Sequence, residues 1–161
     1  MSLSQLLEKR LHNQGPVRVG LIGAGKFGSM FLTQVPTTVG IEVTWIADLD
    51  PQRARNTCRI VGWEAQRTSA TQFTDDSLVL IAADDVDVVV EATRDPLVGV
   101  THARAAVGAG KHLVMVNVEA DVLAGPALAR EAEAAGVVYS MAYGDQPALV
   151  CELVDWARTC G

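Results

Sequence analysis

Hydrophobic and polar positions change period repeatedly along the chain, and this alternation predicts strands separated by helices. Short apolar runs bounded by glycine, proline or polar residues indicate buried strands at residues 17–23, 41–48, 86–93, 112–117 and 137–141. The segment VDVVVEAT, at 86–93, is apolar almost throughout, as is typical of a parallel strand covered on both faces. A weaker strand is expected within residues 64–68, which makes about six strands in all.

Apolar residues at helical spacing fill the segments between these runs. Leu6, Leu7 and Leu11 predict a short amphipathic opening helix, which Gly15 and Pro16 end. Further helices are expected at residues 27–35, 51–62, 95–110, 126–135 and 148–158. Strands that alternate with helical crossovers predict an α/β fold with a doubly wound parallel sheet and helices on both faces. The expected strand order is 3-2-1-4-5-6.

Composition and charge narrow the classes of function. The chain has 161 residues, 49% of them hydrophobic, and a formal net charge of −6. It therefore suits one globular domain, and its acidity argues against a nucleic-acid partner. No apolar run approaches the ~20 residues of a membrane span. Cys58, Cys151 and Cys160 form neither a disulfide framework nor a zinc-binding spacing, so we expect a cytoplasmic protein without a metal site.

The clearest indication of a binding site in the sequence is a glycine-rich turn. The segment GAGKFG is a G-x-G-x-x-G that follows a predicted strand and opens a predicted helix, the context that makes this motif specific for dinucleotides. Gly23 would allow the tight turn, Gly25 would let the backbone approach a pyrophosphate, and Gly28 would let the helix pack on its strand. A glycine-rich turn without a ligand is the alternative. The residues expected to hold the cofactor here are Gly23, Gly25, Lys26, Phe27 and Gly28.

Asp48 ends the second predicted strand, twenty residues after Gly28. An acidic residue there accepts hydrogen bonds from the adenosine ribose, although a solvated loop carboxylate is the alternative. A carboxylate disfavours the 2′-phosphate of NADP, whereas Arg53 and Arg55 either offset that repulsion or lie on an exposed helix face. We therefore expect NAD or NADP, with NAD favoured. The motif and the strand order together predict a Rossmann domain over residues 16–161, preceded by a helix at residues 1–15.

Four segments resemble one known family: the glycine motif, VDVVVEATRDP at 86–96, MVNVEADVLAG at 115–125 and AYGDQPA at 142–148. Together they resemble the NAD-binding domain of homoserine dehydrogenase. They are still more similar to its SAF-domain-containing relatives, which include the deoxyxylulose-phosphate reductoisomerase-like proteins. The resemblance covers nearly the whole chain, and it implies the cofactor-binding domain of an oxidoreductase that acts on a small carbonyl or hydroxyl substrate.

The resemblance also assigns residues to the reacting end of the cofactor. It implies that the turn Glu91-Ala92-Thr93 runs close to the nicotinamide ribose, with Ala92 and Thr93 binding the cofactor. It also implies that the turn containing Asn117 and Glu119 approaches the nicotinamide and the substrate. The chain departs from homoserine dehydrogenases at Val118, where they carry a lysine. That departure argues against homoserine as the substrate.

Two carboxylates are candidate catalytic groups. Glu119 and Asp145 lie in turns that follow strands, where they could position substrate or relay a proton. Each could equally serve a structural role such as a helix cap, and Asn117 could equally serve a turn. His102 lies inside a predicted helix and His112 begins a strand, so structural roles are favoured for both.

The chain ends at Gly161, just after the helix that follows the sixth predicted strand. Enzymes of the resembling family hold substrate between this domain and a following one. We therefore expect the substrate domain to be absent after residue 161, and this chain alone to bind cofactor without turnover. The intact protein would be an NAD(P)-dependent oxidoreductase, either monomeric or homo-oligomeric. Two alternatives are a non-catalytic dinucleotide-binding or redox-sensing module and a methyltransferase that binds S-adenosylmethionine.

Overall fold

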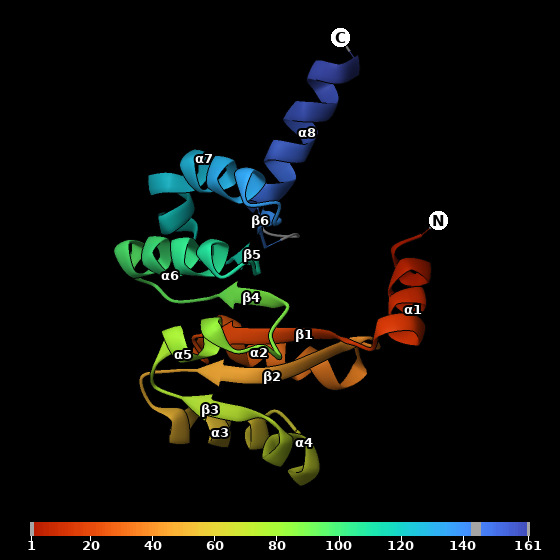
Figure 1. The fold of residues 1–161 in the computed structure, drawn as a ribbon, viewed down its shortest axis with the longest axis vertical. Helices are drawn as coiled ribbons and strands as arrows, with labels where there is room; N and C mark the ends of the chain where they lie inside the picture. Colours follow the sequence, from red (N-terminus) through yellow and green to blue (C-terminus); the bar gives the residue numbers. More distant parts are fainter. Residues whose placement is uncertain (1, 143–145, 161) are drawn as a thin grey trace.

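A six-stranded parallel sheet forms the centre of the molecule (Figure 1). The computed structural model describes residues 2–142 and 146–160. The strand order is β3-β2-β1-β4-β5-β6, which confirms the predicted doubly wound fold. The strands are β1 Val17–Ile22, β2 Ile41–Ala47, β3 Gln72–Thr74, β4 Val88–Glu91, β5 His112–Met115 and β6 Tyr139–Met141.

Helices connect the strands and fix where each strand ends. They are α1 Leu3–Gln14, α2 Lys26–Gln34, the 3-10 turn η1 Val35–Thr37, α3 Pro51–Ile60, α4 Ala65–Ala70, α5 Ser77–Ala82, α6 Pro96–Gly108, α7 Val118–Ala134 and α8 Gln146–Cys160. Four of the crossover helices begin after a residue whose side chain accepts an N–H group of the first turn: Asp50, Asp76, Asp95 and Asn117. Each such cap stabilises a helix start by about 1 kcal/mol.

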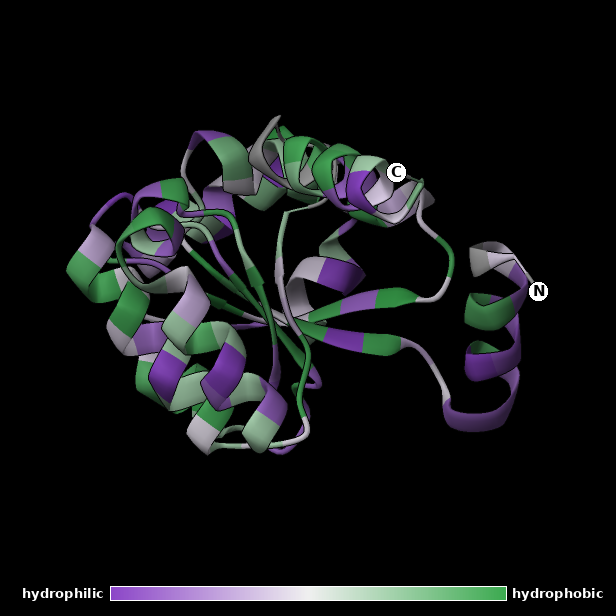
Figure 2. Ribbon diagram, turned by 90° about the horizontal axis from the view of Figure 1, so that it is seen from above, coloured by the Kyte–Doolittle hydropathy of each residue, from purple (hydrophilic) through white to green (hydrophobic). Residues whose placement is uncertain are grey.

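Two apolar cores lie on opposite faces of the sheet. One contains Leu80 and Ile81 of α5, Ala103 and Ala106 of α6, and Leu128 of α7. The other joins α2 and α3 to the sheet through buried residues that include Leu32, Ala54 and Cys58. Figure 2 shows the strands, largely hydrophobic, surrounded by helices that mix hydrophobic and hydrophilic positions. The prediction of helices on both faces is therefore confirmed.

The prediction of a third strand within residues 64–68 is wrong. That segment belongs to α4, and β3 follows it at Gln72–Thr74. The strand has three residues and pairs only with β2, along Trp45–Ala47. A short edge strand buries little apolar surface, so its hydrophobic pattern is too weak to find. The helix α5 was not predicted either, because its run SLVLIA is apolar at every position after the serine and shows no helical period.

The helix after β5 begins at Val118 and not at residue 126 as predicted. Asn117 caps it, and Glu119 and Asp121 in the first turn complement the positive end of the helix dipole. Pro126 therefore lies inside the helix, where the sequence indicated a start. Ala120 and Leu128, on either side of Pro126 in the sequence, are both buried in the core and hold this helix against the sheet.

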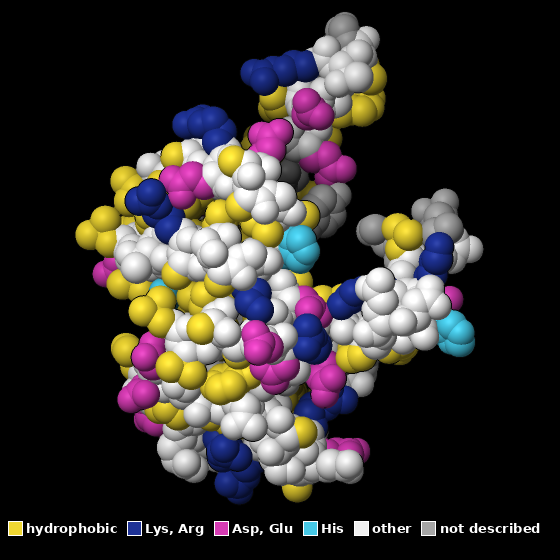
Figure 3. All heavy atoms as spheres, in the orientation of Figure 1, with side chains coloured by type: hydrophobic (Ala, Val, Ile, Leu, Met, Phe, Trp, Pro, Cys, Tyr) yellow, Lys and Arg dark blue, Asp and Glu magenta, His cyan; other side chains and the backbone are white. Residues whose placement is uncertain are grey.

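The first and last helices stand apart from the sheet (Figure 1). On α1, Arg10 forms an ion pair with Asp87 at 2.9 Å. On α8, the apolar side chains of Leu153 and Trp156 are 63% and 65% exposed, and Figure 3 shows hydrophobic side chains on its surface. Among the described residues, no helix is long and apolar enough to cross a membrane.

Asp87, which precedes β4, connects α1 to the sheet through hydrogen bonds and ion pairs. Its carboxylate accepts from Arg10, from the Arg18 guanidinium at 2.6 Å, and from the Arg18 backbone N–H. The hydrogen bond from the Arg18 side chain is the largest influence, and it lowers the pKa of Asp87 to about 2. A depressed pKa means that the stabilisation is complete above the unfolded-state pKa of ~3.9 and is lost as the pH falls toward about 2.

We expect Asp87→Asn to lower the free energy of unfolding at pH 7 by about 1 kcal/mol, the scale of a partly exposed ion pair supported by a backbone hydrogen bond. The difference from the parent should shrink as the pH falls from about 4 to about 2. Urea unfolding at a series of pH values measures it. Asp84→Asn removes an equal charge from an exposed position nearby and is the control. A pH-independent difference would contradict the ion-pair explanation.

Candidate functional site

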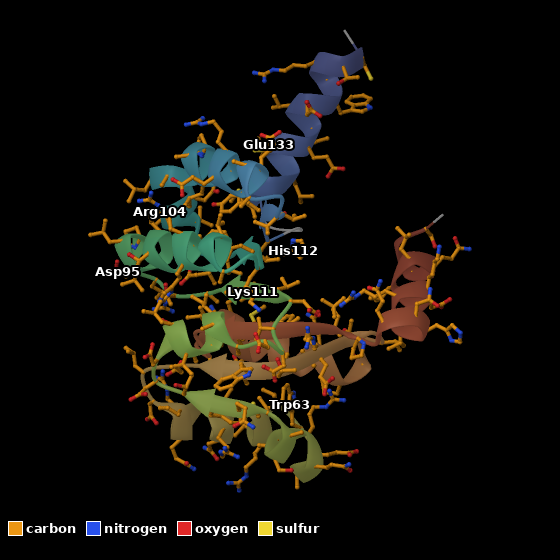
Figure 4. All side chains as sticks on the ribbon, in the orientation of Figure 1. Trp63, Asp95, Arg104, Lys111, His112 and Glu133 are labelled. Carbon is orange, nitrogen blue, oxygen red and sulfur yellow. The ribbon has the colours of Figure 1, made fainter. Side chains whose placement is uncertain are left out.

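All six strands point the same way, so their carboxyl ends form one edge of the sheet. In Figure 4 this edge lies on the left, where Asp95 marks the start of α6, whereas Lys111 and His112 mark the opposite edge. Open α/β sheets bind ligands at the carboxyl edge, where the crossovers change direction. The glycine turn follows β1, Asp48 follows β2 and Thr93 follows β4, so this edge gathers most of the predicted site.

Each glycine of the motif meets a different steric requirement. Gly23 has φ 96°, and an added Cβ would lie 2.8 Å from the carbonyl oxygen of Ala92. At Gly28 an added Cβ would lie 2.3 Å from the carbonyl oxygen of Gly23. At Gly25 an added Cβ would meet no atom within 4 Å. Two glycines are therefore required by the fold itself, whereas Gly25 leaves open space at the start of α2.

Asp48 connects the end of β2 to the glycine turn. Its Oδ2 accepts from the backbone N–H of Ala24 at 2.9 Å, and its Oδ1 accepts from Asp50 N–H at 3.0 Å and from the Arg53 guanidinium at 2.7 Å. Burial would raise the pKa of Asp48, but these three hydrogen bonds outweigh it and hold the pKa below its usual range. Asp48 is therefore ionised at neutral pH, with one acceptor position left on Oδ2.

Thr93 and Asn117 are joined into one network after β4 and β5. Asn117 Nδ2 donates to Thr93 Oγ1 at 3.2 Å and to the carbonyl oxygen of Asp95 at 2.9 Å. Asn117 Oδ1 accepts the N–H of Ala120 and caps α7. Because Asn117 is 2% exposed and both of its N–H groups are engaged, it holds the Thr93 turn in place.

Three of the remaining predicted residues are exposed at the starts of helices, and a fourth lies outside the described residues. Lys26 and Phe27 are exposed in the first turn of α2. Glu119 is exposed in the first turn of α7, one helical position after Val118, and the cap of that helix is Asn117 and not Glu119. Asp145 lies outside the described residues.

Glu91 belongs to the turn that the resemblance places near the nicotinamide ribose, but its burial and its contact with His102 were not predicted. Glu91, the last residue of β4, is fully buried, and His102 of α6 lies against it with Nδ1 3.2 Å from Oε1. The other ring nitrogen of His102 lies 2.7 Å from Ser77 Oγ. Ser77 and His102 line an open hollow of about 500 Å³ between α5 and α6. The available signal was a carboxylate ending an otherwise apolar strand.

Comparison with known protein families identifies the fold family of this site. Over residues 17–143 the chain matches the GFO/IDH/MocA model, described as an oxidoreductase family with an NAD-binding Rossmann fold. Inositol 2-dehydrogenase 2 of Paenarthrobacter aurescens is 39% identical over 89 residues, which cover 55% of this chain and 23% of that protein.

Solved structures agree on the fold. A homoserine dehydrogenase from Thiobacillus denitrificans has a TM-score of 0.66 and 21% identity, over 78% of this chain and 29% of that chain. Biliverdin reductase from Synechocystis, solved with biliverdin and NADP+, has a TM-score of 0.61 and 20% identity, over 78% and 37% of the two chains. The chain thus spans well under half the length of these relatives. It belongs to the GFO/IDH/MocA oxidoreductase family and contains that family's NAD-binding Rossmann fold.

Proposed function

We propose that residues 16–161 are the cofactor-binding domain of a longer NAD(P)-dependent oxidoreductase, preceded by the helix at residues 1–15. The intact protein acts on a small carbonyl or hydroxyl substrate held by a domain outside this chain. The observation that carries the proposal is the open space at Gly25, where the backbone starts a nine-residue helix and an added Cβ would meet no protein atom. A pyrophosphate needs such an approach to free N–H groups.

The surrounding residues fit a dinucleotide from end to end. Gly23, Gly25, Lys26, Phe27 and Gly28 would cradle the pyrophosphate. Asp48 would accept a hydroxyl of the adenosine ribose at the position left on Oδ2, and Ala92 and Thr93 would lie beside the nicotinamide ribose, with Asn117 fixing their turn. The bound nicotinamide would supply or accept a hydride, and the chain's own residues would orient it.

Arg53 governs the choice between NAD and NADP in this proposal. Its guanidinium pairs with Asp48 while its side chain remains 62% exposed, so it can turn toward a 2′-phosphate at the cost of one exposed ion pair. The negative charge of Asp48 opposes that phosphate. NAD is therefore favoured and NADP is tolerated.

The proposal for the substrate and the catalytic residues rests on the resemblance and on the sequence segments that follow β5 and β6. The motifs MVNVEADVLAG and AYGDQPA favour an SAF-domain-containing, deoxyxylulose-phosphate reductoisomerase-like protein. Glu119 and Asp145 are the proposed catalytic carboxylates. The scattered cysteines favour a cytoplasmic protein, the formal charge of −6 argues against a nucleic-acid partner, and no membrane partner is proposed because no apolar run approaches a membrane span. The exposed apolar residues of α8 support a further domain or a second subunit as its neighbour.

Gly25→Val should abolish binding of NAD and NADP without unfolding the domain, because the valine side chain would occupy the space that the pyrophosphate needs. Calorimetric titration with both cofactors measures the loss. Gly108→Val is a matched control, since Gly108 ends α6 at the opposite edge of the sheet and an added Cβ there also meets no atom within 4 Å. Undiminished binding by a folded Gly25→Val variant would falsify the pyrophosphate site.

Asp48→Asn should weaken NAD binding about tenfold and narrow or reverse the preference over NADP. The reason is the loss of a charged acceptor for the ribose hydroxyl together with the removal of charge repulsion. Titrations of both cofactors give the ratio of dissociation constants. Arg53→Gln, which removes the opposite charge, should shift that ratio toward NAD. A ratio unchanged in the Asp48 variant would show that Asp48 does not contact the ribose.

In the longer protein, Glu119→Gln should lower kcat by ~10²-fold while leaving the NAD dissociation constant unchanged, because a positioned acid or base contributes on that scale. Glu133→Gln is the control, since Glu133 is also exposed on α7 but lies at the far end of that helix (Figure 4). Steady-state kinetics measure both variants. Equal turnover in the Glu119 variant and the parent removes Glu119 from the chemistry, and Asp145→Asn is then tested in its place.

A further inference from the structure

A buried carboxylate controls the residue proposed to face the nicotinamide half of the cofactor. We propose that Glu91 is a positioning residue, which, together with His102, orients the hydroxyl of Thr93 so that Thr93 presents a hydrogen-bond acceptor to the nicotinamide ribose. The inference rests on the proposed cofactor function. It assigns a role to two residues that the binding motif does not include.

Three donors converge on one oxygen of Glu91. Oε1 accepts from the backbone N–H of Thr93 at 3.3 Å, from the Thr93 hydroxyl through a short hydrogen bond, and from His102 Nδ1 at 3.2 Å. Oε2 is buried without a hydrogen-bond partner among the described residues. Since a carboxylate oxygen can only accept, Nδ1 of His102 carries its hydrogen and donates to Glu91.

This geometry fixes the direction of the Thr93 hydrogen bonds. Its hydroxyl hydrogen is committed to Glu91, and one of its two lone pairs accepts from Asn117 Nδ2 at 3.2 Å. A hydroxyl has one hydrogen and two acceptor positions, so the remaining capacity of Thr93 is one lone pair. The ligand group that meets Thr93 is therefore a donor, as a ribose hydroxyl is.

His102 of α6 connects Glu91 to the start of α5. His102 is 8% exposed, and its second ring nitrogen bonds to Ser77, which borders the hollow between α5 and α6. Asp75 and Asp76 also line that hollow. The contact with His102 thus holds the buried Glu91 side chain in place at the base of the cofactor turn.

A purely structural role of Glu91 and His102 would change ligand binding in a different way from the role we propose. If the network only joined β4 to α6, weakening it would lower the stability of the domain and reduce the binding of every ligand alike. If it acts through Thr93, the loss is confined to ligands that carry the second ribose. ADP lacks that ribose, ADP-ribose contains it, and NAD+ adds the nicotinamide.

The experiment titrates these three ligands by calorimetry into the parent chain and into Glu91→Gln, which keeps the shape and removes the charge. We expect about tenfold weaker binding of ADP-ribose and NAD+ and unchanged binding of ADP. Equal weakening of all three ligands, or no weakening of any, would overturn the proposal. Asp87→Asn, at the other end of the same strand region, controls for lost stability and should bind all three ligands as the parent does.

A double-mutant cycle tests whether Glu91 acts through Thr93. Thr93→Val removes the hydroxyl and should weaken the same two ligands, whereas Thr93→Ser keeps the hydroxyl and should restore binding. The Glu91→Gln, Thr93→Val double variant should be no weaker than Thr93→Val alone, and additive losses would overturn the proposal. If Glu91→Gln does not fold, the valine and serine variants decide the outcome with the same ligands. A parent chain that binds no dinucleotide would overturn the proposed function itself, which separates the two failures.

Discussion

The missing Cβ of Gly28 is the constraint on which the rest of the binding edge depends. The carbonyl oxygen of Gly23 occupies that space, so a side chain at position 28 would force α2 away from the end of β1. The close approach places the first turn of α2 directly over the sheet edge. A side chain at Gly23 is excluded for a similar reason, because its Cβ would lie against the carbonyl oxygen of Ala92. The turns after β1 and β4 are therefore packed against each other before any ligand binds.

Two carboxylates then hold the turns from either side. Asp48 receives the N–H groups of Ala24 and Asp50 and pairs with the exposed Arg53, and its Oδ2 has one acceptor position left. Glu91 receives both polar hydrogens of Thr93 and is fully buried. The two carboxylates thus hold the turns after β2 and β4, and in our proposal the first contacts the cofactor while the second acts through Thr93.

The parts of this edge that depend on local patterns were predictable from the sequence. The glycine spacing, the acidic residue ending the second strand and the apolar run at 86–93 each follow from the geometry of one turn or one strand. The strand β3 was not predicted, because three residues at a sheet edge show almost no alternation of hydrophobic and polar positions. The predicted start of α7 was eight residues too late, because a proline usually lies in the first turn of a helix. The Glu91–His102–Ser77 contacts were beyond the sequence because they join β4, α6 and the start of α5. A side chain's partner across three elements depends on the packed fold and leaves no periodic signal.

The pairing of β1 with β4 has a consequence for how the domain assembles during synthesis. Val19 pairs with Val88, and the N–H of Ala92 donates to Ile22 across the same contact, so the glycine turn is completed only after most of the first hundred residues have been made. Until then β1 can pair only with β2, and its other edge, which pairs with β4 in the complete sheet, has no partner. Such an open edge is prone to wrong pairing. A cofactor that contacts both halves stabilises only the completed form, so it would draw the nascent domain toward the native strand order.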